Sequence, residues 1–399
     1  MQPPDKGTRR ISRRLVWLLG TFVVMFGCSD APQDIGLDGL RVGSLLGATA
    51  DDGYAKAVAP RPLAFPRDHG PHLKFKSEWW YLTSVLADDS GREFGVQWTL
   101  FRQALSSEPL GAGPWLTGQA YMAHLAISDV DRQRHLHAQR LARGHPKLAG
   151  VRGEPLEMWI EDWRVKSESR GELMEFKLRA EEVGKMAIAL DLHQTQPILL
   201  HGDAGLSKKG DEQASYYYSM SRLATAGRIN IGQESFEVKG WTWFDREWST
   251  SVLGDGLVGW DWFALRLDDG RDIMTFSLRR REGTRDPHDY LLLRRGENVA
   301  KLTLLEENEQ SFFDVVPVRY WRDSQGIDWP VAWRLRVQSN EGWAADSSGE
   351  PEVFDIEALI DDQLMNVGLK YWEGIVKVSR GGVRVGSGYM ELTGYGSEN

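Results

Sequence analysis

Residues 79–101 read WWYLTSVLADDSGREFGVQWTLF, which is two runs of aromatic and β-branched side chains around a polar turn. Such side chains fit the pleated surface of a sheet, and Asp88-Asp89-Ser90-Gly91 offers the residue types that tight turns favour. The stretch therefore predicts a β-hairpin whose strands cover 79–86 and 94–101.

A second copy of this pattern begins at Trp260. Residues 260–267 form its first run, Asp268-Asp269-Gly270 its turn and residues 273–278 its second run. A repeat at such a distance is too long for a solenoid and suggests two similar domains in tandem. The alternative is that two unrelated hairpins share a common turn chemistry.

Further short segments with strand-like alternation fill the chain around both copies. They lie at 121–128, 156–165, 173–180, 187–192, 236–248, 290–294, 316–321, 333–338, 353–359, 371–378 and 388–394. Even spacing with Gly, Asp and Asn between segments is typical of a sandwich or an antiparallel barrel, and closing a barrel removes exposed sheet edges. We predict an all-β protein of two tandem antiparallel β-barrel domains, over residues 65–250 and 251–399.

Composition agrees with this prediction. A chain of 399 residues is too long for one ordinary core, and 17 tryptophans with 42 glycines favour β structure. The net charge is -9, and the acidic residues are dispersed. We therefore expect a soluble body and no nucleic-acid partner.

The first 28 residues have the layout of an export signal. Four arginines between positions 9 and 14 precede an apolar run over 15–26, which ends at Gly27-Cys28 and is short for a membrane span. Cys28, the single cysteine, resembles the acylated cysteine of bacterial lipoproteins, and Ser12-Arg13-Arg14 resembles a twin-arginine signal. A plain signal peptide or membrane anchor with an incidental cysteine is the alternative.

This layout predicts a lipid-anchored protein of the cell envelope that faces the periplasm. Residues 29–64, rich in small side chains, are expected to form a tether. Which of the two membranes holds the anchor is left open.

The residues best suited to chemistry lie in GWTWFDREWS, residues 240–249. In a strand, Trp241, Trp243, Asp245 and Glu247 share one face, whereas Phe244, Arg246 and Trp248 share the other. A carboxyl among indoles in a poorly hydrated cavity has a raised pKa and can act as a general acid, while indole faces stabilise positive charge. A structural pairing of these charged groups at a barrel rim is the alternative.

Other candidates stand elsewhere in the chain. Glu78 precedes Trp79 and Tyr81, and it is either part of the same site or a charge at the barrel rim. His124 is a second candidate acid or base, although a lone histidine on a strand is more often structural.

Metal, hydrolase and phosphate sites have weaker signals. His69-x-x-His72 and His135-x-His137 stand in polar, loop-like stretches without a third ligand at a regular interval. There is no Gly-x-Ser-x-Gly motif at a predicted nucleophile elbow, and residues 202–210 lack the order of a phosphate loop. We expect no metal and no cofactor.

Several separated motifs together resemble the AttH/CrtC family of lipocalin-like proteins. They are Glu78-Trp79-Trp80-Tyr81, residues 91–102, Ala123-His124-Leu125-Ala126, residues 243–248, Tyr371-Trp372-Glu373-Gly374 and residues 388–395. The resemblance covers the chain from about Phe65 to Tyr395, and it implies two tandem lipocalin-like barrels.

The CrtC branch of that family contains carotenoid 1,2-hydratases, in which an aspartate in an Asp-x-x-Trp setting protonates a terminal alkene. Asp245 and Trp248 match that setting, but Arg246 stands where the hydratases carry histidine. Tyr216 and Tyr218 add aromatic side chains that the resemblance makes candidates for ligand contact.

The AttH branch comprises exported proteins called predicted secreted hydrolases, which are associated with ABC-type export systems. Because of the lipid anchor, we predict an AttH-like lipoprotein that binds an apolar, lipid- or terpenoid-like ligand and assists an ABC-type envelope transporter. A hydratase (hydro-lyase) or isomerase that uses Asp245, a secreted hydrolase, and an envelope protein with solidly packed barrels are the alternatives.

Overall fold

The computed structural model describes residues 53–108, 113, 117–168, 173–210, 212–250, 254, 256–303, 312–338, 350–368 and 370–396. The predicted export signal, Cys28 and most of the predicted tether lie outside these residues. Within the described ranges the chain forms strands joined by loops, with one short 3₁₀ turn, η2 (Arg67–His69). No helix in these ranges has the length and hydrophobicity of a membrane span.

Thirteen antiparallel strands make the first sheet, in the order β4-β3-β2-β1-β13-β12-β9-β8-β7-β6-β5, with β10 and β11 also paired to β12. They are β1 (Ser77–Ala87), β2 (Glu93–Ala104), β3 (Gln119–Asp129), β4 (Arg134–Arg143), β5 (Ala149–Gly153), β6 (Leu156–Ile160), β7 (Trp163–Ser167), β8 (Glu175–Glu182), β9 (Met186–Gln194), β10 (Leu199–Leu200), β11 (Leu206–Lys208), β12 (Ala214–Ile231) and β13 (Glu234–Ser249).

Ten antiparallel strands make the second sheet, in the order β17-β16-β15-β14-β23-β22-β20-β19-β18, with β21 also paired to β22. They are β14 (Leu257–Leu267), β15 (Arg271–Arg280), β16 (Tyr290–Arg295), β17 (Asn298–Thr303), β18 (Phe312–Arg322), β19 (Asp328–Gln338), β20 (Glu352–Ala358), β21 (Leu364–Met365), β22 (Tyr371–Arg380) and β23 (Val383–Thr393).

Both predicted hairpins are present. Strands β1 and β2 pair with Trp79 opposite Phe101, and β14 and β15 pair with Trp262 opposite Phe276. Gly91 and Gly270 close the two turns with φ angles of 87° and 92°, which glycine adopts without strain. The predicted all-β class with two lipocalin-like antiparallel barrels is confirmed.

The structure corrects two details of the strand prediction. Residues 156–165 form two strands rather than one, because the chain turns at Glu161, whose φ is +54°. His135 and His137 were expected in a loop, but they lie on β4, paired with β3. The alternation of β4 is weak because its side chains are half-buried on both faces.

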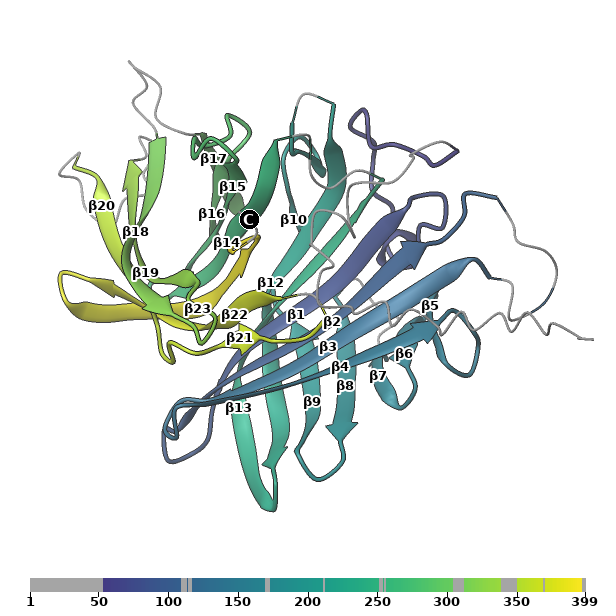
Figure 1. The fold of residues 1–399 in the computed structure, drawn as a ribbon, viewed down its shortest axis with the longest axis horizontal. Coiled ribbons are helices and arrows are strands. Elements are labelled where there is room, and N and C mark those ends of the chain that lie inside the picture. The colour runs from purple at the N-terminus through teal and green to yellow at the C-terminus, as the bar shows by residue number, and fades with distance from the viewer. Residues whose placement is uncertain are drawn as a thin grey trace, which may run out of the picture. The chain divides into compact units, whose positions relative to one another are not determined.

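Each sheet bends around its own inner face (Figure 1). The first core gathers side chains such as Trp80, Trp98 and Phe244, and the second gathers Phe263, Trp329 and Trp372. Burying a large apolar side chain contributes about 1.5–3 kcal/mol, so these two cores supply much of the folding free energy.

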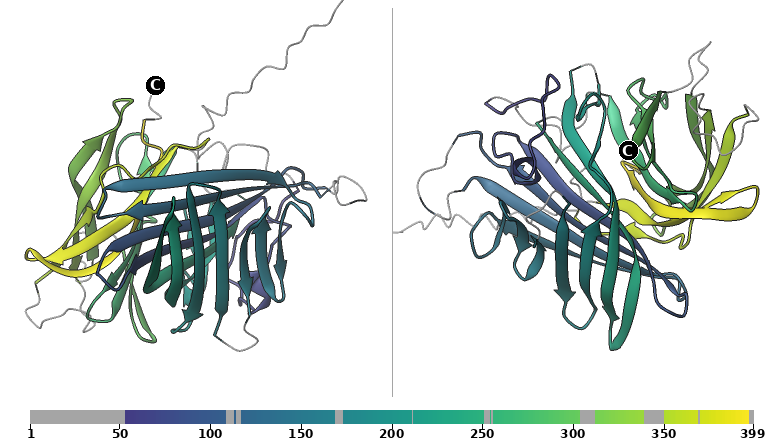
Figure 2. Two further views of the ribbon diagram at one scale, coloured as in Figure 1. Left: turned by 90° about the horizontal axis from the view of Figure 1, so that it is seen from below. Right: turned by 180° about the vertical axis from the view of Figure 1, so that it is seen from behind.

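The outer faces of the two sheets bury a third layer, which we call the seam. Its side chains come from β1, β12 and β13 of the first sheet and from β14, β15, β16, β22 and β23 of the second; among them are Tyr81, Tyr217, Trp243, Trp262, Phe276, Tyr290, Ile375 and Tyr389. Figure 2 shows the meeting of these strands from two further directions. Because both faces of the central strands are buried, alternate residues of one strand serve two different layers.

Candidate active site in the seam

Strand β13 brings Asp245 to the centre of the seam. Asp245 is directly opposite Tyr81 of β1 on one side and Ser219 of β12 on the other. Its side chain is buried, with 3% of the residue exposed. The odd-numbered residues of β13 therefore face the second sheet, as the alternation in the sequence predicts for Trp241, Trp243, Asp245 and Glu247.

The carboxyl group of Asp245 accepts three hydrogen bonds. Oδ1 accepts from the indole N–H of Trp243 at 2.7 Å and from the hydroxyl of Ser219. Oδ2 accepts from the hydroxyl of Tyr217 at 2.7 Å, and that hydroxyl accepts from the indole of Trp262 at 3.2 Å. Both sheets thus contribute to holding this carboxyl.

Burial raises the pKa of Asp245 to about 7, although the hydrogen bonds from Ser219, Tyr217 and Trp243 act in the opposite direction. The negative charge of Glu247 adds to the increase. A carboxyl with this pKa holds a proton in a large fraction of molecules at neutral pH, which suits a general acid.

His201 extends the hydrogen-bonded chain behind Asp245. Its Nε2 lies 2.5 Å from Oγ of Ser219, and its ring stacks on Tyr217 with centroids 3.7 Å apart. Burial keeps the pKa of His201 well below its ordinary value, so the ring is neutral. The chain His201–Ser219–Asp245 offers a path along which a proton can move.

A second pair of carboxyls lies in the same layer. Glu373 of β22 and Glu391 of β23 are opposite one another in the register. The hydroxyl of Tyr81 donates to Oε1 of Glu373 at 2.5 Å, and the indole of Trp260 donates to Oε1 of Glu391 at 3.2 Å.

The pKa values of this pair are raised. Burial raises the pKa of Glu391 to about 7, and burial together with the charge of Glu391 raises the pKa of Glu373 well above its ordinary value. The charges of Asp245 and Glu247 also raise the pKa of Glu391. Ionisation of the carboxyls on β13 therefore disfavours ionisation of Glu391 on β23.

His124 lies on the seam face of β3. It is linked through Tyr371 to Glu373 and not to Asp245. Its Nδ1 is 2.7 Å from the hydroxyl of Tyr371, and its Nε2 is 3.1 Å from Oε1 of Gln139. Burial lowers the pKa of His124 to about 4, which makes it a neutral hydrogen-bonding group.

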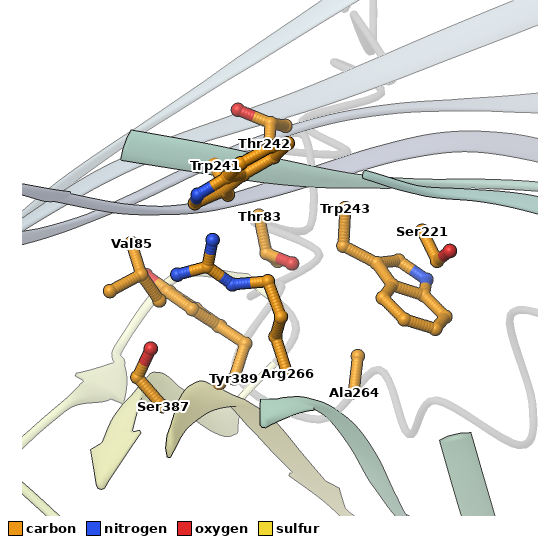
Figure 3. A pocket seen from close by; sticks show the side chains of 11 residues that line it. Thr83, Val85, Ser221, Trp241, Thr242, Trp243, Ala264, Arg266, Ser387 and Tyr389 are labelled. Atoms are coloured by element: carbon orange, nitrogen blue, oxygen red, sulfur yellow. The ribbon is translucent and has the colours of Figure 1, made fainter. Parts of the chain in front are cut away.

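A cleft opens in the seam beside Trp243 (Figure 3). The empty space between its walls is about 310 Å³, and this figure includes space that is open to solvent. Its lining is Thr83, Val85, Ser221, Trp241, Thr242, Trp243, Ala264, Arg266, Ser387, Gly388 and Tyr389. Trp243 belongs to both features, because its ring lines the cleft and its N–H binds Asp245.

Glu78 lies on the opposite face of the first sheet from Asp245. It is buried and forms ion pairs with Arg102 and Arg246, and the guanidinium of Arg246 lies 3.9 Å from the ring centre of Trp80. The two arginines hold the pKa of Glu78 well below its usual range against the effect of burial. Glu78 therefore belongs to a buried ion cluster on the side of the sheet away from Asp245.

Three of the predicted aromatic contacts also face the first core. Tyr216, Tyr218 and Trp248 pack there, and His72 stacks on Trp248 with centroids 3.9 Å apart. The hydroxyl of Tyr218 lies 2.6 Å from Nδ1 of His69. The structure therefore does not bring these three rings to Asp245.

The remaining predicted residues do lie on the seam side. Trp79 and Tyr81 pack in the seam, and Trp241 lines the cleft. Glu247 accepts a hydrogen bond from Ser215 and lies 3.4 Å from Nζ of Lys209. Among the residues that the structure describes, no three histidine, cysteine, aspartate or glutamate side chains gather as metal ligands would.

Sequence reasoning missed Tyr217, Ser219, His201, Glu373 and Glu391. Tyr217 and Ser219 alternate with Tyr216 and Tyr218 on β12. The alternation of that strand could therefore have indicated that Tyr217 and Ser219 share the face opposite to Tyr216 and Tyr218. Glu373 and Glu391 stand within motifs of the family resemblance, but only the pairing of β22 with β23 shows that they meet.

Comparison with known proteins identifies the family. The model of the AttH-like family matches residues 56–395. A solved AttH structure from Nitrosomonas europaea is 33% identical, with a TM-score of 0.70, and the match covers 86% of this chain and 99% of that one. No curated protein matches the chain.

Two more distant structures share the fold. Kievitone hydratase from Nectria haematococca is 14% identical with a TM-score of 0.60, and the match covers 88% of this chain and 97% of that one. CghA, solved with Sch210972, is 12% identical with a TM-score of 0.54 and the same coverage. Given the family match and the 33% identity, the chain belongs to the AttH-like family of lipocalin-like proteins.

Proposed function

We propose that this protein is an acid–base enzyme of the hydratase or isomerase class, which binds an apolar alkene in the seam and protonates it through Asp245. The observation that carries the proposal is a buried carboxyl with a pKa of about 7 whose hydrogen-bonding indole, Trp243, also lines a cleft. A kievitone hydratase shares the fold, but the proposal is based on the site.

In the proposed reaction, the proton of Asp245 passes to one alkene carbon and positive charge develops on the neighbouring carbon. Trp243, whose N–H donates to the carboxyl, would stabilise that charge through its ring. Water then adds to the cation, and Asp245 recovers a proton from the added water, so the net product is an alcohol. If a neighbouring C–H proton leaves instead, the product is an isomerised alkene.

The cleft and the carboxyl are neighbours along β13. Trp243 lines the cleft and stands two residues from Asp245, a separation of about 7 Å in a strand. The reacting alkene therefore has to approach along the edge of the Trp243 ring, while the rest of the ligand occupies the cleft. The indoles on both sides keep this approach poor in water, which maintains the raised pKa.

The test uses the purified protein, a panel of acyclic terpenoid alkenes and D₂O as solvent. The proposal predicts that one or more probes gain either the mass of one D₂O or a carbon-bound deuterium. Asp245→Asn keeps the shape of the side chain but removes its proton donor, and general acid catalysis is worth about 10²–10⁴-fold. The variant is expected to lose turnover by at least that factor while retaining the probe.

A matched control separates loss of chemistry from loss of folding. Asp191→Asn removes a carboxyl of the same kind that pairs with Arg179 at the surface. This control is expected to turn over the probe at the wild-type rate. Turnover by Asp245→Asn at the wild-type rate would refute the proposed role of Asp245.

A carrier is the second candidate function, and the sequence at Cys28 favours it. A lipid anchor in the envelope suits a protein that holds an apolar ligand for an ABC-type transporter, with no chemistry at Asp245. We propose for either function that the chain is exported, acylated at Cys28 and faces the periplasm. Radiolabelled palmitate should label the wild type and not Cys28→Ala, and mass spectrometry of the detergent-purified protein should identify a retained apolar molecule.

The two functions differ in the effect of Asp245→Asn. A carrier with this substitution retains its ligand and its transport function, whereas a hydratase retains the ligand and loses the product.

A further inference from the structure

We infer that the cleft in the seam recognises ligands carrying a carboxylate, and that Arg266 is the residue that binds it. This inference deepens the proposed function by naming the class of substrate, an apolar chain with one acidic end. It is based on two polar groups of the cleft, Arg266 and Thr83, that have no hydrogen-bond or ion-pair partner among the residues that the structure describes.

Arg266 projects from β14 into the cleft. Its neighbours Leu265 and Leu267 face the second core, so alternation directs Arg266 to the seam. Its guanidinium carbon lies 5.0 Å from the ring centre of Trp241, and Figure 3 shows the group extending into the space between Trp241 and Tyr389.

The guanidinium of Arg266 has no anionic partner among the described residues, where no hydrogen bond or ion pair involves it. Nearby Arg222 differs, because its Nε donates to Oδ1 of Asp272 at 2.8 Å. Burial and the charge of Arg222 lower the pKa of Arg266 to about 10, although the charges of Asp272 and Asp268 act in the opposite direction, so it remains a cation at neutral pH. A partly buried cation without a direct ion pair is costly, and an anionic ligand would reduce that cost.

Thr83 supplies the second observation. It is 3% exposed, lines the same cleft, and its Oγ1 has no hydrogen-bond partner in the described part of the chain. The hydroxyl of Thr242, also in the lining, is by contrast 2.7 Å from the hydroxyls of both Ser84 and Thr225. The cleft therefore holds a guanidinium and a hydroxyl that are both available to donate.

These donors stand in a cleft that also has aromatic walls, as in sites where a few polar groups orient a largely hydrophobic ligand. Trp241, Trp243 and Tyr389 supply the aromatic surface. A carboxylate matches the planar, forked geometry of a guanidinium and forms charge-assisted hydrogen bonds with it. An alcohol or an amine gains much less from Arg266, and an amine is repelled by its charge.

The arrangement also sets the spacing within the ligand. Arg266 lies over Trp241, which precedes Asp245 by four residues on β13, so the backbone positions of Trp241 and Asp245 are separated by about 13 Å. A substrate whose carboxylate binds Arg266 would place a double bond about 13 Å away beside Asp245.

The experiment compares octanoate, 1-octanol and octylamine, which share one chain and differ in the charge of the end group. Binding to the purified protein is measured by isothermal titration calorimetry at pH 7. The inference predicts that octanoate binds at least tenfold more tightly than octylamine. Arg266→Gln should weaken octanoate about tenfold and leave octanol unchanged, and Arg266→Lys should recover part of the loss.

Two further variants control the result. Arg228→Gln removes an exposed arginine that pairs with Glu237 on the same sheet, and it should bind all three probes as the wild type does. Thr83→Val keeps the shape of the side chain and should weaken octanoate more than octanol. Thermal unfolding of each variant verifies that it is folded.

The remaining outcomes distinguish the inference about Arg266 from the proposed function. Equal affinity for the three probes, or unchanged octanoate binding by a folded Arg266→Gln variant, overturns the inference but leaves an apolar cleft and the proposed chemistry intact. Absence of binding by every probe overturns both the inference and the use of this cleft. Loss of turnover in Asp245→Asn with octanoate binding unchanged would support the two proposals independently.

Discussion

The indole N–H of Trp243 donates to Oδ1 of Asp245 at 2.7 Å, and the same indole ring lines the cleft of the seam. One side chain thus separates the space for a ligand from the group proposed to protonate it. The hydrogen bond favours the carboxylate, whereas burial favours the neutral acid, and burial has the larger effect on the pKa.

The rate of the proposed reaction should fall as the pH rises through about 7. The pKa of Asp245 is raised to about 7, so its reactive protonated form is abundant below that pH and is lost above it. The pH profile of turnover for a probe identified in D₂O tests this. A rate that increases as the pH rises through 7 would require a base rather than an acid.

Trp243→Phe should shift that limb of the profile to higher pH. The substitution retains an aromatic wall but removes one donor to the carboxylate, and losing a hydrogen bond to the charged form raises the pKa further. The measurement is the midpoint of the pH profile in both proteins. A shift to lower pH would contradict the assigned hydrogen bond, and Trp241→Phe, which changes another indole of the cleft, should leave the midpoint unchanged.

The stability of the wild type relative to Asp245→Asn should fall as the pH rises. In the unfolded chain the aspartate has an ordinary pKa near 3.9, whereas in the folded protein it is about 7. The folded state therefore binds the proton more tightly, so the wild type loses stability between about pH 4 and pH 7 that the asparagine variant does not lose. The full difference amounts to at most about 4 kcal/mol, of which roughly 2.6 kcal/mol lies between pH 5 and pH 8, where urea unfolding of both proteins measures it.

Glu78→Gln should destabilise the fold by about 3–5 kcal/mol, because it leaves the buried guanidinium groups of Arg102 and Arg246 without their shared counter-ion. Glu237→Gln breaks an exposed pair with Arg228 and should cost less than about 1 kcal/mol. Denaturant unfolding compares the two variants. Similar small losses in both would mean that the Glu78 cluster does not support the fold as described.

The fold could be predicted from local features of the sequence. Both hairpins combine alternating apolar side chains with a Gly-containing turn, and these signals lie within a single short stretch. The division of β13 into two faces followed from the same alternation, which placed Trp241, Trp243, Asp245 and Glu247 together.

What alternation could not show is which face of a strand meets which layer. Both faces of β1, β12 and β13 are buried, so Glu78 before β1's aromatic run and Asp245 within β13 have similar sequence surroundings but lie on opposite sides of the sheet. The pairing of Tyr81 with Glu373 joins residues of the two sheets that are distant in the sequence. Only the packing of one sheet on the other brings them together.

The most direct test of the account is the titration of the Asp245 carboxyl itself. Infrared difference spectra between the wild type and Asp245→Asn isolate the C=O stretch of the neutral carboxyl, which can be followed from pH 4 to pH 9. The account predicts that this band is present at pH 5 and disappears with a midpoint near 7. A band already absent at pH 5 would show that Asp245 is an ordinary carboxylate and would contradict its role as the proton donor.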